Sequence, residues 1–301
     1  MAHRAFATLR RLPLVPITIL VLLIACAVLA PLIAPHDPEE QSLLMRLTPP
    51  AWMAGGDWSY PLGTDGLGRD VLSNIVFGLR ISLLTGFIAV ALSVVVGGTV
   101  GLIAGYRANG WLDTVAMRLV DIQLSLPAVL IALAVLAISG RGLWKVIFVI
   151  GLVGWAQYAR LVRSIVLSER KKNYVTAAVV AGASQRRVLF RHILPNVLSP
   201  LLVQVSVDIP RAVELEASLS FLGLGVAVTT PSIGLRISQA YQYLYSGGWW
   251  ASVLPGIALV ILVLSENQIG DWIRDALDPR MRSIRMRRKK AIRSVGSDLP
   301  A

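Results

Sequence analysis

The segment that decides how this chain is interpreted reads "AAVVAGASQRRVLFRHILPN" (177–196). It carries Arg186, Arg187, Arg191 and His192 without a single acid, in a chain that is otherwise rich in apolar residues. Basic residues close to membrane helices are informative because they collect on the cytoplasmic side of a membrane. The meaning of this segment therefore depends on the topology that the rest of the sequence predicts.

The composition places the chain in the membrane class. Of its 301 residues, 55 % are hydrophobic and only 15 % are charged, and the mean hydropathy is +0.67. A soluble domain of this length needs more charge to cover its surface. We therefore expect an all-α polytopic membrane protein, in which helices satisfy the backbone groups within the lipid. The single cysteine, Cys26, excludes an internal disulfide.

The amino-terminal region resembles a signal peptide but fits a retained helix better. Arg4, Arg10 and Arg11 precede the apolar run 14–33, and the "LIAC" that ends at Cys26 looks like a lipoprotein cleavage box. However, the run continues past the cysteine through "AVLAPLI", where a lipoprotein would turn polar. An uncleaved first membrane helix is therefore favoured over a removed signal.

Six apolar stretches are long enough to cross a bilayer as helices. They cover residues 14–34, 81–105, 115–138, 143–165, 196–225 and 250–272. The second stretch contains Gly97, Gly101 and Gly105, a doubled G-x-x-x-G that lets a neighbouring helix approach closely. We expect this packing to occur within one subunit rather than at a dimer seam.

The bases concentrate in alternate connecting segments. Residues 1–13, 160–195 and 273–301 are strongly basic, whereas acids outnumber bases in 35–80. This positive-inside pattern predicts that both termini lie in the cytoplasm. The net charge of +12 then reflects topology and contact with anionic membrane lipid, so no nucleic-acid partner is needed.

The expected organisation of the chain follows from these spans and charges. In order, the parts are a cytoplasmic tail (1–13), a first transmembrane helix (14–34), an extracytoplasmic loop (35–80), a five-helix core (81–272) with an amphipathic segment at 173–195, and a basic cytoplasmic tail (273–301).

No motif predicts catalysis, a cofactor or a metal. In "LGTDGLGRD" (62–70), Gly63 and Gly68 have phosphate-loop spacing, but Arg69 and Asp70 stand where Lys and Ser/Thr are required. These glycines are better explained as turn residues of an external loop. "GASQ" with the nearby histidine only faintly resembles a serine protease, and the sequence offers no H-E-x-x-H motif.

Charged and polar residues occur within the predicted spans, where they usually face a cavity or a partner charge. They are Asp121, Asp208, Arg211, Glu214, Glu216, Glu266 and Asn267. Two explanations stay open, namely pairing between i,i+3 neighbours or at a subunit interface, and a polar transport path. Pro210 frees the carbonyl of Ser206, which permits a kink or break that suits a conduit.

The opening segment has a small-residue stripe. Val175, Val179, Ala183 and Leu189 recur at helical spacing, together with Ala178 and Gly182. A basic amphipathic helix often rests on lipid headgroups, but lipid anchors favour bulky side chains, and small residues suit a groove in a protein. Gly182 allows a bend, and Pro195 ends the segment.

"YVTAAVVAGASQRRVLFRHILPN" (174–196) resembles the cytoplasmic coupling segment of binding-protein-dependent ABC importer permeases through Ala177, Ala178, Gly182, Leu194 and Pro195. Other blocks narrow the resemblance to the dipeptide/oligopeptide/nickel permease family, and to the second permease of its pair. They are "PLGTDGLGRDVLS" (61–73), "RISLL" (80–84), "MRLVDIQLSLP" (117–127), "YARLVRS" (158–164), "LEASLSFLGLG" (215–225) and "IRDALDPRMR" (273–282).

This resemblance implies a type I importer permease fold with a coupling helix between helices 4 and 5, in a bacterial inner membrane. It implies four kinds of binding partner: a homologous permease, two cytosolic ATP-binding subunits that hydrolyse the ATP, an extracytoplasmic solute-binding protein, and lipid. The cargo would be di- or oligopeptides. The residues implied in ATPase coupling are Tyr174, Thr176, Ala177, Ala178, Gly182, Ala183, Leu194 and Pro195.

Two rival functions fit the sequence less well. A secondary transporter should show internal repeats with matching broken helices, and the two halves show no repeat. A membrane-anchored scaffold does not explain charges within the spans.

Two residues depart from the family pattern. Thr176 stands where a Glu is usual, and Glu266 precedes Asn267 where Phe-Asn is usual. No base on its own span lies within a turn of Glu266, so it is expected at the permease interface or the cytoplasmic mouth, with packing against a neighbouring helix as the alternative.

Overall fold

The computed structural model describes residues 13–277. Within that range the regular structure is helical, and only an isolated β-bridge joins Thr64 to Asp70. The elements are α2 (Leu14–Val28), α3 (Ala30–Ile33), η1 (Leu43–Met45), α4 (Val71–Tyr106), α5 (Trp111–Leu124), α6 (Ala128–Ser139), α7 (Leu143–Glu169), α8 (Asn173–Val180), α9 (Gln185–Arg187), the π-helical η2 (Val188–Ile193), α10 (Leu194–Phe221), α11 (Ile233–Ala240), η3 (Tyr241–Tyr243) and α12 (Trp250–Leu277).

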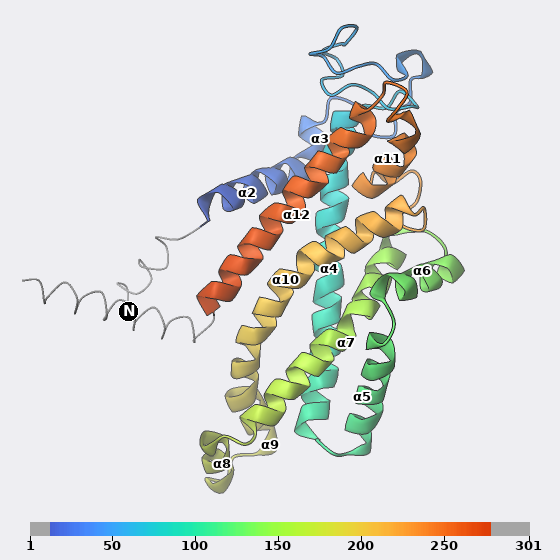
Figure 1. Ribbon diagram of the computed structural model, residues 1–301. Helices are drawn as coiled ribbons and strands as arrows, with labels where there is room; N and C mark the ends of the chain where they lie inside the picture. Colours follow the sequence, from blue (N-terminus) through green and yellow to red (C-terminus); the bar gives the residue numbers. More distant parts are fainter. Residues whose placement is uncertain (1–12, 278–301) are drawn as a thin grey trace, which may run out of the picture.

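The long helix α4 runs through the length of the molecule (Figure 1). It packs against α7 along one side and against α10, α2 and α12 on others. The loop that precedes α4 forms one end of the molecule together with α11 and η3, and α8 and α9 form the opposite end (Figure 1). The two ends are thus far apart, and α4, α7 and α10 connect them.

Glycines bring α4 and α7 into close contact. A Cβ at Gly97 would lie 2.1 Å from the carbonyl oxygen of Trp155, and one at Gly101 would lie 2.4 Å from that of Ala159. No larger residue fits at such distances without moving the backbone. The doubled G-x-x-x-G therefore packs two helices of one subunit, as the sequence predicted.

The predicted third span is not one continuous helix. α5 and α6 meet at an angle of 93° across a short break, at Ser125, Leu126 and Pro127. Pro127 disfavours helical geometry at the residue before it and has no N–H to continue the ladder. It is the residue before the first turn of α6 instead. Hydropathy alone missed this bend because both halves are apolar.

The second predicted span also differs, because α4 begins at Val71 and not at 81. The Asp70 carboxylate caps this helix by accepting hydrogen bonds from the Ser73 amide (2.9 Å) and hydroxyl (2.5 Å). Gly63 and Gly68 have φ values of +78° and +71°, so both occupy the left-handed region that favours glycine. The apparent phosphate-loop spacing is a turn followed by a helix cap.

α10 runs unbroken through Pro200 and Pro210 from Leu194 to Phe221, so the break that Pro210 permits does not occur. The carbonyl of Ser206, which Pro210 leaves without its helical donor, lies against Gly270 of α12. A Cβ at Gly270 would come within 2.6 Å of that oxygen. The close approach of α12 covers the exposed backbone group.

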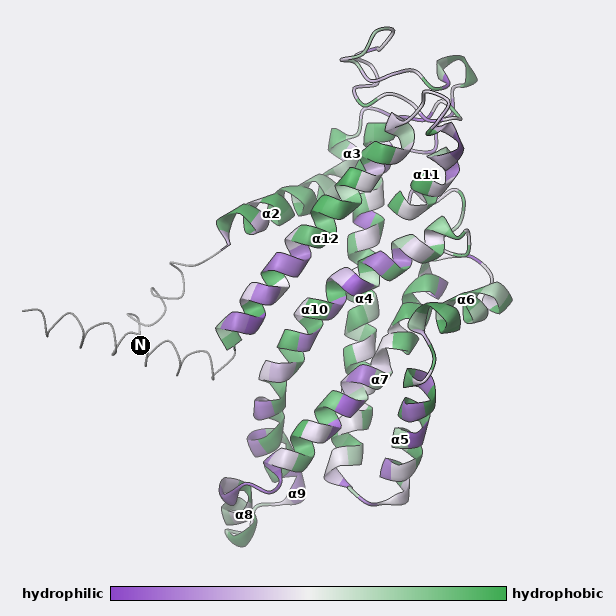
Figure 2. Ribbon diagram, in the orientation of Figure 1, coloured by the Kyte–Doolittle hydropathy of each residue, from purple (hydrophilic) through white to green (hydrophobic). Residues whose placement is uncertain are grey.

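Among residues 13–277, four helices are long and apolar enough to cross a membrane, namely α4, α7, the continuous α9–α10 segment and α12, and the bent α5–α6 pair adds a fifth. α2 is a shorter apolar helix of 15 residues. It is hydrophobic over most of its length and lies beside α12 (Figure 2). Its inner residues Leu20, Leu23, Ile24 and Ala27 belong to the same core as α4 and α12.

Candidate functional site

The first candidate site is the predicted coupling segment, residues 173–195, at one end of the molecule (Figure 1). Its helix α8 ends in a Schellman motif, in which the Gly182 amide donates to the Val179 carbonyl (3.0 Å) and the Ala183 amide donates to the Ala178 carbonyl (3.0 Å). Gly182 has a φ of +83°, which explains why glycine stands there. The predicted bend is therefore present.

The predicted small-residue stripe does not form a single face. Val175 is buried, and Ala178, Ala183 and Leu189 pack with it against the protein's own core. Val179 is 57 % exposed. Packing of α8 against the rest of the chain, which the residue spacing did not predict, divides the stripe into a part that faces the protein core and a part that faces outward. The outer surface consists of Thr176, Ala177, Val179, Val180, Ala181 and Gly182.

A small polar network fixes α8 to the helices on either side. The Tyr174 hydroxyl donates to the Glu169 carboxylate at the end of α7, which also pairs with Lys172. The Asn196 side-chain amide, in the first turn of α10, donates to the Tyr174 hydroxyl (3.0 Å) and to the His192 carbonyl (2.8 Å). Burial, and then the neighbouring Glu169 carboxylate, raise the pKa of Tyr174 to about 12.

Leu194 and Pro195 begin α10 and do not lie on the outer surface of α8. Pro195 cannot donate a helical hydrogen bond, and its ring crowds the carbonyl four residues earlier. The preceding residues widen into the π-helical stretch η2. These two residues therefore position the segment and do not extend its exposed face.

Arg170 adds a third attachment. Its guanidinium donates to the carbonyl oxygens of Tyr106 (2.7 Å) and Gly105 (3.2 Å) at the carboxyl end of α4. A cation at this position also complements the negative end of the helix dipole. α4, α7, α8 and α10 are thus tied together at the end where the outer surface is presented.

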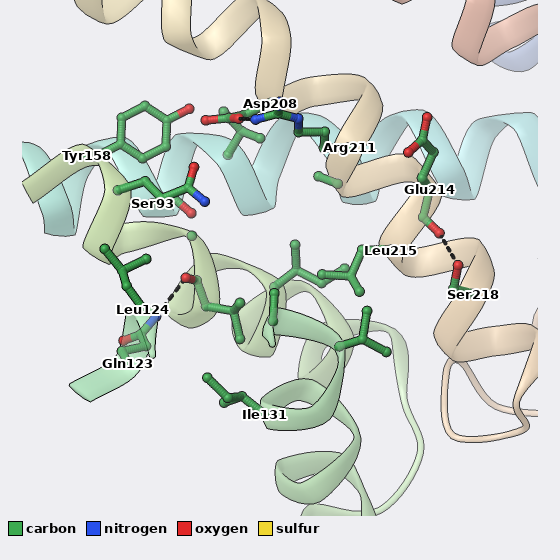
Figure 3. A pocket seen from close by; sticks show the side chains of 18 of the residues that line it. Ser93, Gln123, Leu124, Ile131, Tyr158, Asp208, Arg211, Glu214, Leu215 and Ser218 are labelled. Atoms are coloured by element: carbon green, nitrogen blue, oxygen red, sulfur yellow. Dashed lines mark hydrogen bonds and ion pairs between the residues drawn. The ribbon is translucent and has the colours of Figure 1, made fainter. Parts of the chain in front are cut away.

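The second candidate site is a cavity of about 440 Å³ between α4, α5, α6, α7 and α10. Three of the charged residues predicted within the spans, Asp208, Arg211 and Glu214, line it. Figure 3 shows the Tyr158 hydroxyl, the Asp208 carboxylate and the Arg211 guanidinium side by side along one edge, with Glu214 further along α10. The geometry brings together residues that the sequence listed only as candidates.

Asp208 and Arg211 form the i,i+3 pair that the spacing suggested, with a distance of 3.2 Å between Arg211 Nη1 and Asp208 Oδ1. The Gln204 side-chain amide also donates to Asp208 (2.9 Å). Arg211 makes no second such pair with Glu214, whose carboxylate has no hydrogen bond or ion pair within residues 13–277. Self-pairing therefore accounts for two of the three charges only.

The remaining polar candidates lie elsewhere. Asp121 pairs with Arg160 of α7 on the exposed surface. Glu216 is completely buried and accepts hydrogen bonds from the hydroxyls of Ser82 (3.0 Å), Ser220 (2.8 Å) and Ser232 (2.8 Å). Glu216 therefore joins α10 to α4 and to the residue before α11, and it does not line the cavity.

Glu266 is 6 % exposed, and neither of its carboxylate oxygens has a hydrogen-bond partner among the described residues. Asn267 beside it is partly buried. Neither residue lines the cavity. Glu266 is thus enclosed by the helices of this chain, and its expected position at the permease interface or the cytoplasmic mouth stays a prediction.

One ionic contact escaped sequence analysis. Asp113 is buried at the start of α5 and accepts two hydrogen bonds from Arg163 of α7, at 2.5 and 2.8 Å. The residues are separated by fifty positions, and only the packing of α5 on α7 brings them together. The one available signal was an acid next to a helix start in a short basic loop.

Comparisons with known proteins agree with this architecture. The chain superposes on a chain of the MetNI methionine ABC transporter, described in inward facing conformations, with a TM-score of 0.55. The match covers 68 % of this chain and 96 % of the other at 23 % identity. A helical membrane subunit with the fold of type I ABC importer permeases is the class that these features define.

Sequence comparisons give the family. Residues 97–283 match the binding-protein-dependent transport system inner membrane component family, and residues 10–50 match the N-terminal TM domain of oligopeptide transport permease C. The chain belongs to the binding-protein-dependent transport permeases. Family membership excludes the rival explanations, a secondary transporter and a membrane-anchored scaffold.

Curated relatives are similar over most of the chain. The Di/tripeptide transport system permease protein DppC of Pseudomonas aeruginosa is 42 % identical over 88 % of this chain and 86 % of its own length. The Dipeptide transport system permease proteins DppC of Haemophilus influenzae and of Escherichia coli (strain K12) are each 43 % identical. They cover 88 % and 87 % of this chain, and 89 % and 87 % of their own lengths.

Proposed function

We propose that this chain is one of two permease subunits in an ATP-driven importer of di- or oligopeptides in a bacterial inner membrane. The chain would enclose the pathway with a homologous permease, receive cargo from an extracytoplasmic binding protein, and transmit the action of two cytosolic ATP-binding subunits. ATP hydrolysis would belong to those subunits. The peptide-transport names of the curated relatives support the cargo class.

The observation that carries the proposal is the exposed outer surface of α8, its attachments to α7 and α10, and the bond from the adjacent Arg170 to α4. A partner that binds this surface would act on α7 and α10 through Tyr174, and on α4 through Arg170. All three of these helices also line the cavity that contains Asp208, Arg211 and Glu214. The coupling segment is thus suited to convert movement of an ATPase into movement of the cavity walls.

The proposed topology has six spans, with α2 as the first and the bent α5–α6 pair as the third, and both termini in the cytoplasm. The concentration of bases in 160–195 supports it. In sealed cells carrying a Cys26→Ala background, a membrane-impermeant thiol reagent should modify a cysteine at Asp57 and spare one at Gln185. Modification at Gln185 would contradict this orientation.

Gly182→Trp tests the docking role. Nothing in the chain lies within 4 Å of a Cβ at this position, so the indole would project outward into the space of a docked partner. In the complete complex we expect stimulation of ATP hydrolysis by loaded binding protein, and import, to fall by about ten-fold or more, which corresponds to about 1.4 kcal/mol of lost docking.

Gly182→Asn is the matched control, because asparagine tolerates the left-handed conformation better than other residues with a Cβ. It should keep the Schellman motif and most of the stimulation. If Gly182→Trp assembles and is stimulated as fully as Gly182→Asn, the outer surface of α8 is not the docking surface.

A further inference from the structure

The cavity-facing side of α10 presents a base between two acids. Asp208, Arg211 and Glu214 are spaced by three residues, so neighbouring positions lie close together on the helix and about 4.5 Å apart along its axis. All three line the cavity. The charges therefore form an ordered row, in contrast to the scattered ion pairs elsewhere in the bundle.

Arg211 has donors to spare. The Arg211 side chain is 61 % exposed, and its one ionic contact within the described range is the bond from Nη1 to Asp208. A guanidinium carries five N–H donors in a planar fork that matches a carboxylate. Asp208, whose side chain is only 12 % exposed, holds the fork at the cavity edge while its remaining donors stay available.

Glu214 supplies the opposite charge without a compensating base. Its side chain is exposed and forms no hydrogen bond or ion pair with any residue of the described range. Since Asp208 balances Arg211, Glu214 leaves this end of the cavity negative. An ammonium group is the cargo group that such a carboxylate stabilises best.

The wall opposite the charged row is mostly apolar. Leu124 at the end of α5 and Ile131 of α6 face it across the cavity, and Leu215 of α10 lies beside it (Figure 3). A ligand with charges along one side and variable side chains along the other would match this division. Free α-amino and α-carboxyl termini that flank a short backbone have this character.

We infer that this cavity recognises the free termini of a short zwitterionic peptide, with Arg211 binding the terminal carboxylate, Glu214 binding the terminal ammonium, and Asp208 positioning Arg211. The inference rests on the proposed function and adds a specificity element within the permease itself. An extended dipeptide spans about 7 Å at most. Arg211 and Glu214 are about 4.5 Å apart along the helix axis, and their long side chains can diverge far enough for their charged groups to reach both ends of such a peptide.

The test uses the complete complex in proteoliposomes with its binding protein. For dipeptides with a free or an amidated carboxyl terminus, import is measured per ATP hydrolysed, at equal occupancy of the binding protein. The parental complex should import the free peptide about ten-fold more efficiently than the amide, as expected for one charge-assisted pair. In Arg211→Met this ratio should fall to about one.

The remaining variants separate recognition from folding. Arg211→Lys should keep part of the discrimination, because lysine retains the charge but not the fork. Glu214→Gln should abolish discrimination against an N-acetylated peptide while leaving that against the amide intact. Ser218→Ala, on the same wall of the cavity, should change neither ratio.

Unchanged ratios in Arg211→Met and Glu214→Gln would overturn the inference. An equal loss of import for free and blocked peptides would also overturn it, since it would show a general effect on assembly. Failure of the parental complex to import any peptide, despite stimulated ATP hydrolysis, would instead refute the proposed cargo class.

Discussion

Two glutamates organise opposite ends of the helix bundle in different ways. Glu216, near the carboxyl end of α10, is completely buried and accepts three hydrogen bonds from serine hydroxyls. Glu169, at the end of α7, is held by Lys172 and Tyr174, and Lys172 is 52 % exposed at its side chain. The first network is sealed inside the protein, whereas the second borders the surface that a partner would bind.

The difference separates a part of the bundle that is firmly fixed from a part whose hydrogen bonds rearrange more easily. A buried, fully hydrogen-bonded carboxylate is costly to disturb, because every donor around it would lose its acceptor. A half-exposed network can exchange its hydrogen bonds with water at small cost. The Glu216 network is therefore suited to hold α4, α10 and α11 in register. On the proposed function, the Glu169 network is suited to follow the movement of a docked subunit.

The largest expected effect is that of Glu216→Leu. It would leave the hydroxyls of Ser82, Ser220 and Ser232 without their acceptor. The free energy of unfolding should fall by about 3 kcal/mol or more, since each buried unsatisfied group costs about 1–3 kcal/mol. Thermal unfolding of the purified complex measures this change.

Glu216→Gln is the control, because it keeps the side-chain volume and one acceptor oxygen, and it should lose clearly less stability. Equal stability of Glu216→Leu and the parental protein would show that the Glu216 network does not anchor the bundle.

An intermediate effect is expected for Tyr174→Phe, which removes the hydroxyl that links Glu169 to Asn196. Stimulated ATP hydrolysis should fall by about two- to five-fold, the effect of a partly exposed hydrogen bond worth about 0.5–1 kcal/mol. Tyr241→Phe, at the opposite end and 55 % exposed, is the control. Loss of thermal stability comparable to that of Glu216→Leu would contradict the distinction between the two networks.

The same network sets a pH dependence. Because the pKa of Tyr174 is raised to about 12 from its usual 10, the hydroxyl remains a donor throughout the neutral range. Its contribution is fully present below about pH 10 and is lost as the pH rises through about 12. The ratio of Tyr174→Phe to parental activity should therefore stay constant between about pH 6 and 9.

The smallest effect on stability is expected for Glu266→Leu. Glu266 is also buried, although slightly less than Glu216, and it lacks hydrogen-bond partners among the described residues. Removing an unpaired buried carboxylate eliminates its desolvation cost, so stability should stay within about 1 kcal/mol or increase. A loss as large as that of Glu216→Leu would reveal a partner outside residues 13–277 or in the second permease.

Sequence analysis predicted much of the local structure because short-range rules decide it. Hydropathy located the helices, glycine spacing predicted the contact of α4 with α7, and the i,i+3 spacing predicted the pair of Asp208 with Arg211. Gly182 was correctly expected at a bend. Most of these features depend on residues within a few turns of one another. The glycine contact needs in addition only the backbone of a neighbouring helix, whatever the sequence of that helix.

The tertiary structure decided which polar residues meet. Spacing could not separate Glu214, which lines the cavity, from Glu216, which is sealed among serines of three segments, because the helix rotation that separates them depends on packing. The contact of Asp113 with Arg163, the 93° turn between α5 and α6 and the inward packing of Ala178 and Ala183 likewise depend on neighbours distant in sequence. Composition and periodicity thus determined a helical membrane protein with an amphipathic segment at 173–195, while helix packing determined which of its charges face the cavity.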